Sequence, residues 1–355
     1  MELLRETIAS IRPADKEAME KAWKRIDGLT KPIGSLGELE NIIAKIAGIT
    51  GKVSNQINKK SIVIMCADNG VWEEGVSNNP QNTTMTVTNN FTRGITGVCV
   101  LAKYSKSDLT IVDIGVKGDF NNHKIINKKV AYGTKNIAKE PAMTREQAIK
   151  AIEIGIDTVD KLVMKDYDML GTGEMGICNT TTSAAVLSVL SDLPVQNVVG
   201  KGSGLTEEQF EHKKRVVQKA IDINKPNKND PIDVISKVGG LDIAGLCGCF
   251  LGAAKNRIPI VIDGFITSAA ALCAYKLNQH VRDFIFPSHL SAEPGAQCMM
   301  NELKLSPMLN LGMRLGEGSG CPLAFSIIES ALYAMNNMAT YEEASLNREC
   351  YIDIR

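Results

Sequence analysis

The fold of this chain is decided by residues 167–183, YDMLGTGEMGICNTTTS. Tyr167–Leu170 is a short run typical of a buried strand, and the Ala-rich segment that follows Ser183 is typical of a helix. The glycines between them match the pattern G-x-G-x-x-G, which we interpret as a glycine-rich loop. A strand, a loop and a helix in this order predict a parallel α/β sheet, in which ligands bind beyond the carboxyl ends of the strands.

The same alternation extends through the rest of the chain. A capping box of Thr144 and Gln147 predicts a helix that runs to about Met164. Residues 1–55 and 304–355 read as mainly helical, so we expect them to pack together as a small domain beside a sheet domain of residues 56–303. The remaining strands are expected at residues 61–66, 109–114, 196–199, 258–262 and 283–286.

The composition narrows the class of protein. The 355 residues include 40 Lys and Arg against 40 Asp and Glu, so no net field favours nucleic acid or an anionic membrane. The first residues lack a signal peptide pattern, and the longest apolar stretch, 239–254, is too short to span a bilayer. The nine cysteines are scattered and lack zinc-ligand spacing. We therefore expect a cytoplasmic protein with reduced thiols and without a structural metal.

The G-x-G-x-x-G pattern leaves two interpretations open. It permits a dinucleotide-binding oxidoreductase. However, Glu174 lies inside the loop and would repel a pyrophosphate, and no acidic residue follows the next expected strand to bind a ribose. The alternative is that backbone amides, with Asn179 and Thr180, hold one phosphate or a sugar.

Other expected strand ends repeat the combination of glycine and a polar residue. Gly200–Gly204 is followed by Lys213 on a helix, Asp263 precedes Gly264, and Ser291 follows the last strand. Each is individually explained by a solvated helix face, a turn or a helix cap. Together, on one edge of a sheet, they favour a phosphorylated sugar as substrate.

The segment 311–320, LGMRLGEGSG, supplies a candidate base. Glu317 lies between Gly316 and Gly318, and Pro322 suits the first turn of a helix. A carboxylate at a helix start is stabilised in its ionised form by free N–H groups. We therefore consider Glu317 a candidate general base, with a capping Glu in a glycine-rich turn as the alternative.

Seven segments are informative when taken together: LTKPIGSLG (29–37), EGVS (74–77), GEMGICNT (173–180), GGLDIA (239–244), IDGFI (262–266), SAEPG (291–295) and LGEGSG (315–320). They resemble the nicotinate-nucleotide:dimethylbenzimidazole phosphoribosyltransferase family. This resemblance implies a Rossmann-like sheet of six parallel strands with helices on both faces, a small helical domain from both chain ends, and a dimer. It also implies transfer of 5-phosphoribose from nicotinate mononucleotide to an aromatic base, with inversion at C1′, for cobalamin and other cobamides.

The resemblance implies roles for particular residues and no metal or cofactor. Glu317 matches the general base that takes the proton of the acceptor, and Glu174 is assigned as a second catalytic carboxylate. Gly316 and Gly318 flank the base. The positions that match the nucleotide site are Gly176, Asn179, Thr180, Lys213, Asp263, Gly264 and Ser291.

The chain departs from the family pattern at the acceptor pocket, which we place at Asn79, Pro80 and Val87. Val87 stands where the family often has Gln, and Asn69 stands where it usually has His. Loss of the amide removes a partner for a ring nitrogen. We therefore expect an acceptor that need not be dimethylbenzimidazole: another azole, or a phenol as in a divergent branch that works as a heterodimer of two paralogues. The alternative is a non-catalytic paralogue that supports an active partner.

Overall fold

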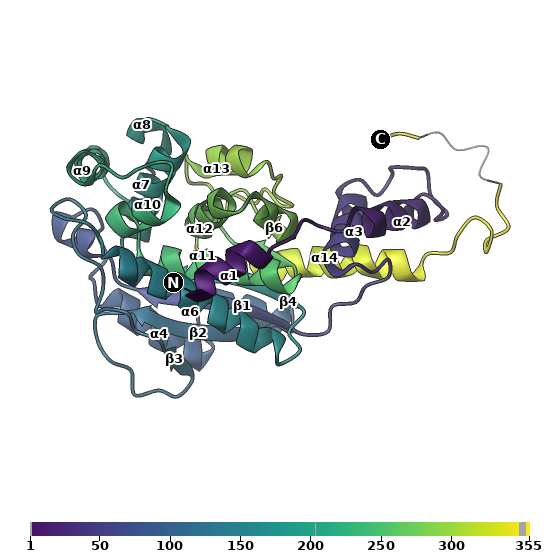
Figure 1. Ribbon diagram of the computed structural model, residues 1–355, viewed down its shortest axis with the longest axis horizontal. Coiled ribbons are helices and arrows are strands. Elements are labelled where there is room, and N and C mark those ends of the chain that lie inside the picture. Colours follow the sequence, from purple (N-terminus) through teal and green to yellow (C-terminus); the bar gives the residue numbers. More distant parts are fainter. Residues whose placement is uncertain (1, 203, 348–352) are drawn as a thin grey trace.

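The computed structural model describes residues 2–202, 204–347 and 353–355. Within these residues one parallel sheet has six strands in the order β3-β2-β1-β4-β5-β6, which confirms the predicted fold class (Figure 1). The order reverses between β1 and β4, and such a switch point opens a crevice at the strand ends. The strands are β1 (Lys60–Ala67), β2 (Asp108–Gly115), β3 (Ile125–Asn127), β4 (Met169–Met175), β5 (Ile260–Ile262) and β6 (Ile285–Pro287).

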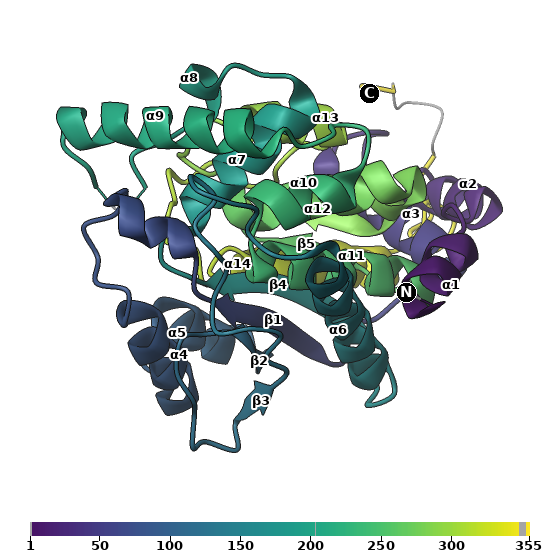
Figure 2. The same cartoon turned by 60° about the vertical axis from the view of Figure 1, so that its left-hand side comes forward.

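Helices cover both faces of the sheet (Figure 2). Side chains alternate between faces along a strand. In β1, Met65 meets Gly245 of α11, whereas Ile62 meets Gly318, just before α14. The first face carries α6 (Arg145–Val163), α11 (Leu241–Asn256) and α12 (Phe265–Leu277), and the second carries α5 (Gly97–Tyr104) and α14 (Cys321–Asn337). An outer group is formed by α7 (Asn179–Ser191), α8 (Val195–Val198), α9 (Glu207–Asn224), α10 (Pro231–Val238) and α13 (Ala296–Leu303).

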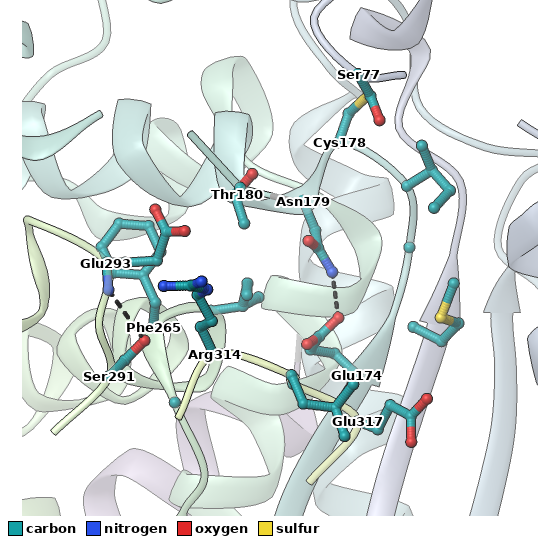
Figure 3. Close-up of a pocket in the computed structure, with 18 of the residues that line it drawn as sticks. Ser77, Glu174, Cys178, Asn179, Thr180, Phe265, Ser291, Glu293, Arg314 and Glu317 are labelled. Atoms are coloured by element: carbon teal, nitrogen blue, oxygen red, sulfur yellow. Dashed lines mark hydrogen bonds between the residues drawn. The ribbon is translucent and has the colours of Figure 1, made fainter. Parts of the chain in front are cut away.

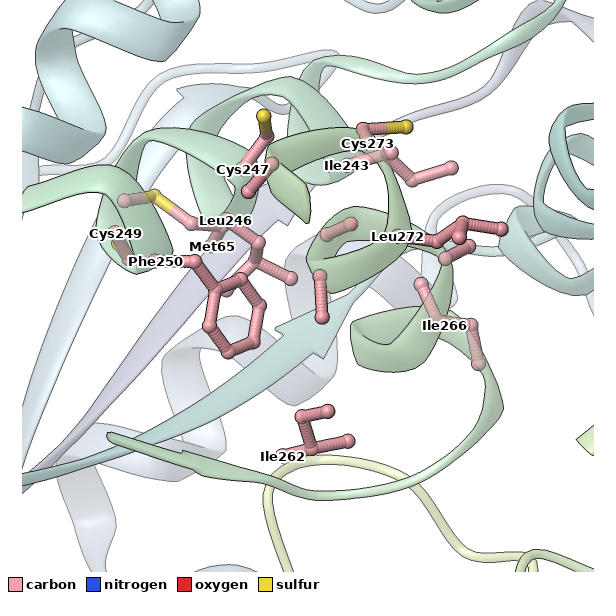
Figure 4. Close-up of a cluster of buried hydrophobic side chains, with 14 of the residues drawn as sticks. Met65, Ile243, Leu246, Cys247, Cys249, Phe250, Ile262, Ile266, Leu272 and Cys273 are labelled. Carbon is pink, nitrogen blue, oxygen red and sulfur yellow. The ribbon is translucent and has the colours of Figure 1, made fainter. Parts of the chain in front are cut away.

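Part of the hydrophobic core lies between the sheet and the pair α11 and α12 (Figure 4). Met65, Phe250 and Leu272 are fully buried there. The helices α6 and α11 cross closely, because a Cβ added at Gly248 would lie 1.9 Å from the carbonyl oxygen of Ile152. No helix in the described part of the chain is both long and apolar enough to cross a membrane. The cysteines of the described ranges are free thiols, and all but Cys298 are buried.

One predicted strand is wrong and one observed strand was missed. Residues 196–199 were expected as a strand, but Val195–Val198 is the short helix α8. A four-residue apolar run fits either element, and here Pro194 precedes a turn that buries Val195 and Val198 on one side. The sixth strand is instead β3, a three-residue edge strand with two exposed residues in a polar segment.

The predicted glycine-rich loop is also wrong over its first half, because residues 171–175 belong to β4. The glycines are required by close packing from the second face. A Cβ added at Gly171 would lie 2.7 Å from Cβ of Cys321, and one added at Gly173 would lie 2.3 Å from the carbonyl oxygen of Glu317. These glycines therefore do not form a dinucleotide-binding turn, which removes the observation that favoured an oxidoreductase.

The predicted capping box is confirmed, because Thr144 and Gln147 cap α6. Asp15 caps α2 (Lys16–Ile26) in a similar position. Gly94 has φ +72° and ends α4 (Thr83–Arg93) before α5 begins. Two short 3₁₀ helices, η1 (Gly70–Glu74) and η2 (Gln279–Phe284), complete the regular structure of the described residues.

The chain ends contribute an arm of helices beside the sheet (Figure 1). α3 (Glu38–Thr50) packs against α2 and α14, whereas α1 (Glu2–Ser10) packs against α6 and α11 of the larger body. Residues 304–320 are irregular rather than mainly helical, and α14 is the helix of the C-terminal part that the structure describes. The division into domains at residues 55 and 304 stays a prediction.

Candidate active site

A cavity of about 250 Å³ opens beyond the carboxyl ends of β1, β4 and β5. Figure 3 shows side chains that line it, with Glu174 and Glu317 on one side and Ser291, Glu293 and Arg314 on another. All but two of the residues predicted for the site line this cavity. They are Asn79, Val87, Glu174, Gly176, Asn179, Thr180, Lys213, Asp263, Gly264, Ser291, Gly316 and Glu317.

The two exceptions are Gly318 and Pro80. Gly318 is buried beneath the cavity, where its N–H donates to Oδ2 of Asp263 over 2.9 Å. Pro80 is exposed and lies outside the lining. Gly318 therefore contributes through its backbone N–H. Of the neighbouring residues Asn79 and Pro80, only Asn79 lines the cavity.

Glu317 is placed by a backbone turn and a helix start. It has φ +63°, a left-handed conformation that is uncommon outside glycine. Its Oε2 accepts a hydrogen bond from the N–H of Val98 over 3.0 Å, in the first turn of α5. The predicted helix N-terminus is therefore present, but it belongs to α5 rather than to α14. The start of α5 thus binds Oε2 of Glu317, and Glu317 itself lines the cavity.

Glu174, at the end of β4, is the second carboxylate of the site. Its Oε2 accepts a hydrogen bond from Nδ2 of Asn179 at the start of α7. Its Oε1 lies 2.7 Å from where a Cβ of Gly316 would be, so the glycine next to Glu317 allows this approach. Burial, together with the charges of Asp242 and Asp263, raises the pKa of Glu174 well above its ordinary value.

Asp263 binds the backbone N–H groups just before α14, the helix start at which Glu317 was expected to lie. Its two oxygens accept the N–H groups of Gly318 and Gly320 over 2.9 and 2.6 Å. Burial raises its pKa to about 7, although these two hydrogen bonds act in the opposite direction. Asp263 thus fixes the loop that carries Glu317 and adds a third acid to the same end of the cavity.

A cationic subsite lies on the α7 side. The Lys213 side chain is almost fully buried, and its Nζ donates to Oγ1 of Thr180 and to the carbonyl oxygen of Gly200 over 2.9 and 3.0 Å. Burial lowers the pKa of Lys213, and the charge of Glu293 partly offsets that shift. An ammonium next to the start of a 13-residue helix is suited to bind a phosphate.

One part of the lining is apolar. Val87 on α4 is half-buried there, and the neighbouring apolar contributors are Val76, Met175, Ile177 and Leu315. The side chain at position 87 thus offers a planar ligand a methyl surface without a hydrogen-bonding group. Such a wall suits an aromatic ring.

Several polar residues of the cavity were not predicted as site residues, among them His289, Glu293 and Arg314. His289 lines the cavity with Nδ1 3.0 Å from Oγ of Ser288. Glu293 packs so closely on Gly200 that a Cβ there would lie 1.8 Å from its Oε2, and burial raises its pKa. Arg314 lies in the stretch already singled out around Glu317. His289 and Glu293 lie in the same loop as Ser291, and Arg314 lies in the same loop as Glu317. This proximity in the sequence could have indicated that they belong to the site.

Comparison with known proteins now identifies the family. A family model described as phosphoribosyltransferase (DBI_PRT) matches residues 11–346. The nicotinate-nucleotide–dimethylbenzimidazole phosphoribosyltransferase of Clostridium tetani is 62% identical over 100% of this chain and 98% of its own length. The chain belongs to this phosphoribosyltransferase family. The protein of the same name from Clostridium acetobutylicum is 54% identical and is matched over 96% of both chains.

Solved structures support the same family. The crystal structure of CobT from Thermus thermophilus superimposes with a TM-score of 0.90 at 36% sequence identity, covering 94% of this chain and 99% of that one. The family resemblance read from the sequence, the Rossmann-like fold and the classification as a phosphoribosyltransferase are therefore confirmed. The roles of individual residues stay predictions.

Proposed function

We propose that this chain transfers 5-phosphoribose from nicotinate mononucleotide to an aromatic base and thereby makes the α-ribotide of a cobamide lower ligand. The observation that carries the proposal is the division of one cavity into a cationic subsite at Lys213 and an acidic end at Glu174 and Glu317. The name of the C. tetani relative contains both the nucleotide and one such base.

The donor phosphate binds at the cationic subsite. Lys213 and the Thr180 side chain lie beside it at the start of α7, and Ser291 lines the same cavity. A dianionic phosphate restores the favourable environment that burial removes from the Lys213 ammonium. Anchoring the phosphate there directs C1′ of the ribose toward the acids, because the cavity continues to Glu174 and Glu317.

Glu317 removes the acceptor proton. As the acceptor nitrogen or oxygen forms its bond to C1′, its N–H or O–H proton passes to Glu317. The bond between C1′ and the nicotinate ring nitrogen breaks, and its electron pair stays on the ring. The Val98 N–H holds Oε2 of Glu317, so Oε1 is the oxygen that takes the proton.

The acidic end also favours the charge that develops on the sugar. The nicotinate ring is cationic while it is bonded to C1′ and becomes neutral as it leaves, and C1′ becomes positive as the bond lengthens. The Glu317 carboxylate lines this end of the cavity and stabilises that positive charge. Both oxygens of Asp263 already accept backbone N–H groups, and burial raises the pKa of Glu174, which favours its protonated form, so we assign the role of base to Glu317.

The acceptor lies against Val87 and its apolar neighbours. An azole has a second ring nitrogen that requires a partner, whereas a phenol has none, and Val87 supplies no hydrogen bond. We therefore propose that the acceptor range extends beyond dimethylbenzimidazole to less polar azoles and phenols.

We also propose that the chain works as a dimer. Large apolar side chains are exposed on the neighbouring helices α5 and α14, where Val100 is 60%, Tyr104 80% and Tyr333 70% exposed. Burying such a surface in a symmetric pair follows the usual pattern of soluble oligomers. Light scattering coupled to size exclusion measures the mass directly, with 38.4 kDa expected for a single chain.

The test of the proposed function is an assay of purified protein with nicotinate mononucleotide and four acceptors: dimethylbenzimidazole, adenine, phenol and p-cresol. We expect α-ribotide product from more than one acceptor. Glu317→Gln should reduce turnover roughly 10²–10⁴-fold, the usual contribution of a general base. Absence of product with all four acceptors would contradict the transfer reaction, and efficient use of dimethylbenzimidazole alone would contradict the broad acceptor range.

A further inference from the structure

A second cavity, of about 580 Å³, lies outside the active site. It is formed where the N-terminal helices α2 and α3 meet η2 and the residues that follow α13, and it shares no lining residue with the first cavity. A smaller cavity of about 230 Å³ adjoins it through Asn41, Lys45, Lys304 and Leu305. The two form one depression between the helical arm and the β6 edge of the sheet.

The charge around this cavity is strongly uneven. The cationic lining residues are Lys16, Lys45, Arg282 and Lys304, and the carboxylate among them is Asp283. Oδ2 of Asp283 already accepts the N–H of Ala14 over 3.1 Å. Among the described residues, none of the four cations has a carboxylate within 4.0 Å. Glu38 of the adjoining cavity is a second carboxylate, so the depression is lined by four cations and two carboxylates and keeps an excess of positive charge.

Lys45 is the central cation because it lines both cavities. Its Nζ donates to the carbonyl oxygen of Ile285 and lies 4.6 Å from the ring centre of Phe286. Burial lowers its pKa to about 8, although the charge of Asp283 acts in the opposite direction and that of Arg282 adds to the lowering. An ammonium in this position is stabilised by a bound anion.

The opposite wall is apolar and aromatic. Trp23, Met19 and Leu305 line it and are half-buried. The Arg355 guanidinium lies 5.4 Å from the ring centre of Trp23, which marks Trp23 as a stacking surface. The cavity thus combines an indole and a thioether with nearby cations, which is the arrangement that binds a flat apolar body bearing one anionic group.

We propose that this cavity is a second binding site, which takes a small aromatic carboxylate. The carboxylate pairs with Lys45 and Lys304, and the ring lies against Trp23 and Met19. The site is separate from the phosphoribosyl transfer site, so the proposal does not depend on which acceptor the enzyme uses.

Trp23 provides the measurement. The chain contains two tryptophans, and Trp72→Phe leaves Trp23 as the sole indole reporter. In that background, 3-iodobenzoate should quench Trp23 emission saturably with a Kd below about 1 mM, which corresponds to about 4 kcal/mol. The neutral isostere 3-iodobenzyl alcohol should bind at least tenfold more weakly, because it lacks the charge that pairs with Lys45.

Substitutions then locate the site. Lys45→Met and Lys304→Met, each in the same background, should weaken 3-iodobenzoate binding about tenfold. Lys304 is exposed, so its variant tests the proposal even if Lys45→Met does not fold. Lys219→Met, an exposed lysine on α9 outside both cavities, is the matched control and should bind as the parent does. Linear quenching without saturation, equal binding of the alcohol, or equal effects of Lys219→Met and Lys304→Met would overturn the proposal.

Discussion

Replacing Gly173 with alanine is expected to slow phosphoribosyl transfer about a hundredfold in an enzyme that still folds. The added Cβ would lie 2.3 Å from the carbonyl oxygen of Glu317 and 2.8 Å from its carbonyl carbon. Ordinary contact begins near 3.4 Å, so the Glu317 backbone must move by about 1 Å. A displacement of this size in a catalytic group costs roughly 10²-fold in rate.

The stability effect of the same substitution is separable from its effect on rate. Overpacking a buried contact costs roughly 1–3 kcal/mol, so the melting temperature should fall by only a few degrees. Gly171→Ala is the matched control on the same strand, because its Cβ would meet the Cys321 side chain at 2.7 Å and not the Glu317 backbone. Calorimetry and steady-state kinetics on both variants measure the two effects.

The expected pattern is similar melting temperatures with a much lower kcat for Gly173→Ala alone. Its KM for nicotinate mononucleotide should change little, since Lys213 and Thr180 lie away from the contact. Gly173→Ala with wild-type kcat, or equal losses of kcat in both variants, would refute the reasoning that β4 positions the base.

Three further predictions concern Lys213, the buried Asp242 in the first turn of α11, and Val87. Lys213→Met should raise KM for nicotinate mononucleotide roughly 10–100-fold by removing a charge-assisted hydrogen bond, and a donor lacking phosphate should show no such difference in paired kinetic assays. Asp242→Asn should make the melting temperature less dependent on pH, because burial raises the pKa of Asp242 to about 7 from an ordinary 3.8. The folded state therefore binds the Asp242 proton more tightly than the unfolded state does. The free energy of unfolding that this proton contributes is complete below about pH 4 and is lost as the pH rises through about 7. Melting curves from pH 4 to 8 check this, and an unchanged slope would contradict it. Val87→Gln should raise kcat/KM for dimethylbenzimidazole relative to p-cresol by up to about tenfold, the worth of one hydrogen bond, and competition between the two acceptors measures the ratio.

Much of the cavity lining was predictable from the sequence because parallel strands all end at one edge of the sheet. Asp263, Thr180 and Ser291 follow different strands, and topology alone brings them to one cavity. The structure also confirms the six-stranded fold class. Neither result required knowledge of contacts between distant residues.

The features that were missed depend on such contacts. The glycines of β4 resemble a loop until Cys321 and Glu317 are packed against them. The helix that holds the Glu317 carboxylate begins about 220 residues earlier in the chain, with Val98 and Glu317 separated by 219 positions, so local spacing pointed to α14 instead of α5. Glu293 and Arg314 were overlooked because an acidic or basic residue in a loop has the same local pattern whether it faces a cavity or water.

The structure separates the groups proposed for the chemistry from those proposed to select the acceptor. Glu174 lies on β4 and the Glu317 backbone rests on that same strand, whereas Val87 belongs to α4, a helix that carries none of the three acids. Substitutions on α4 can therefore alter which ring is accepted while the distance between the two carboxylates is unchanged. A lineage can exchange one cobamide base for another by this route without rebuilding its catalytic apparatus.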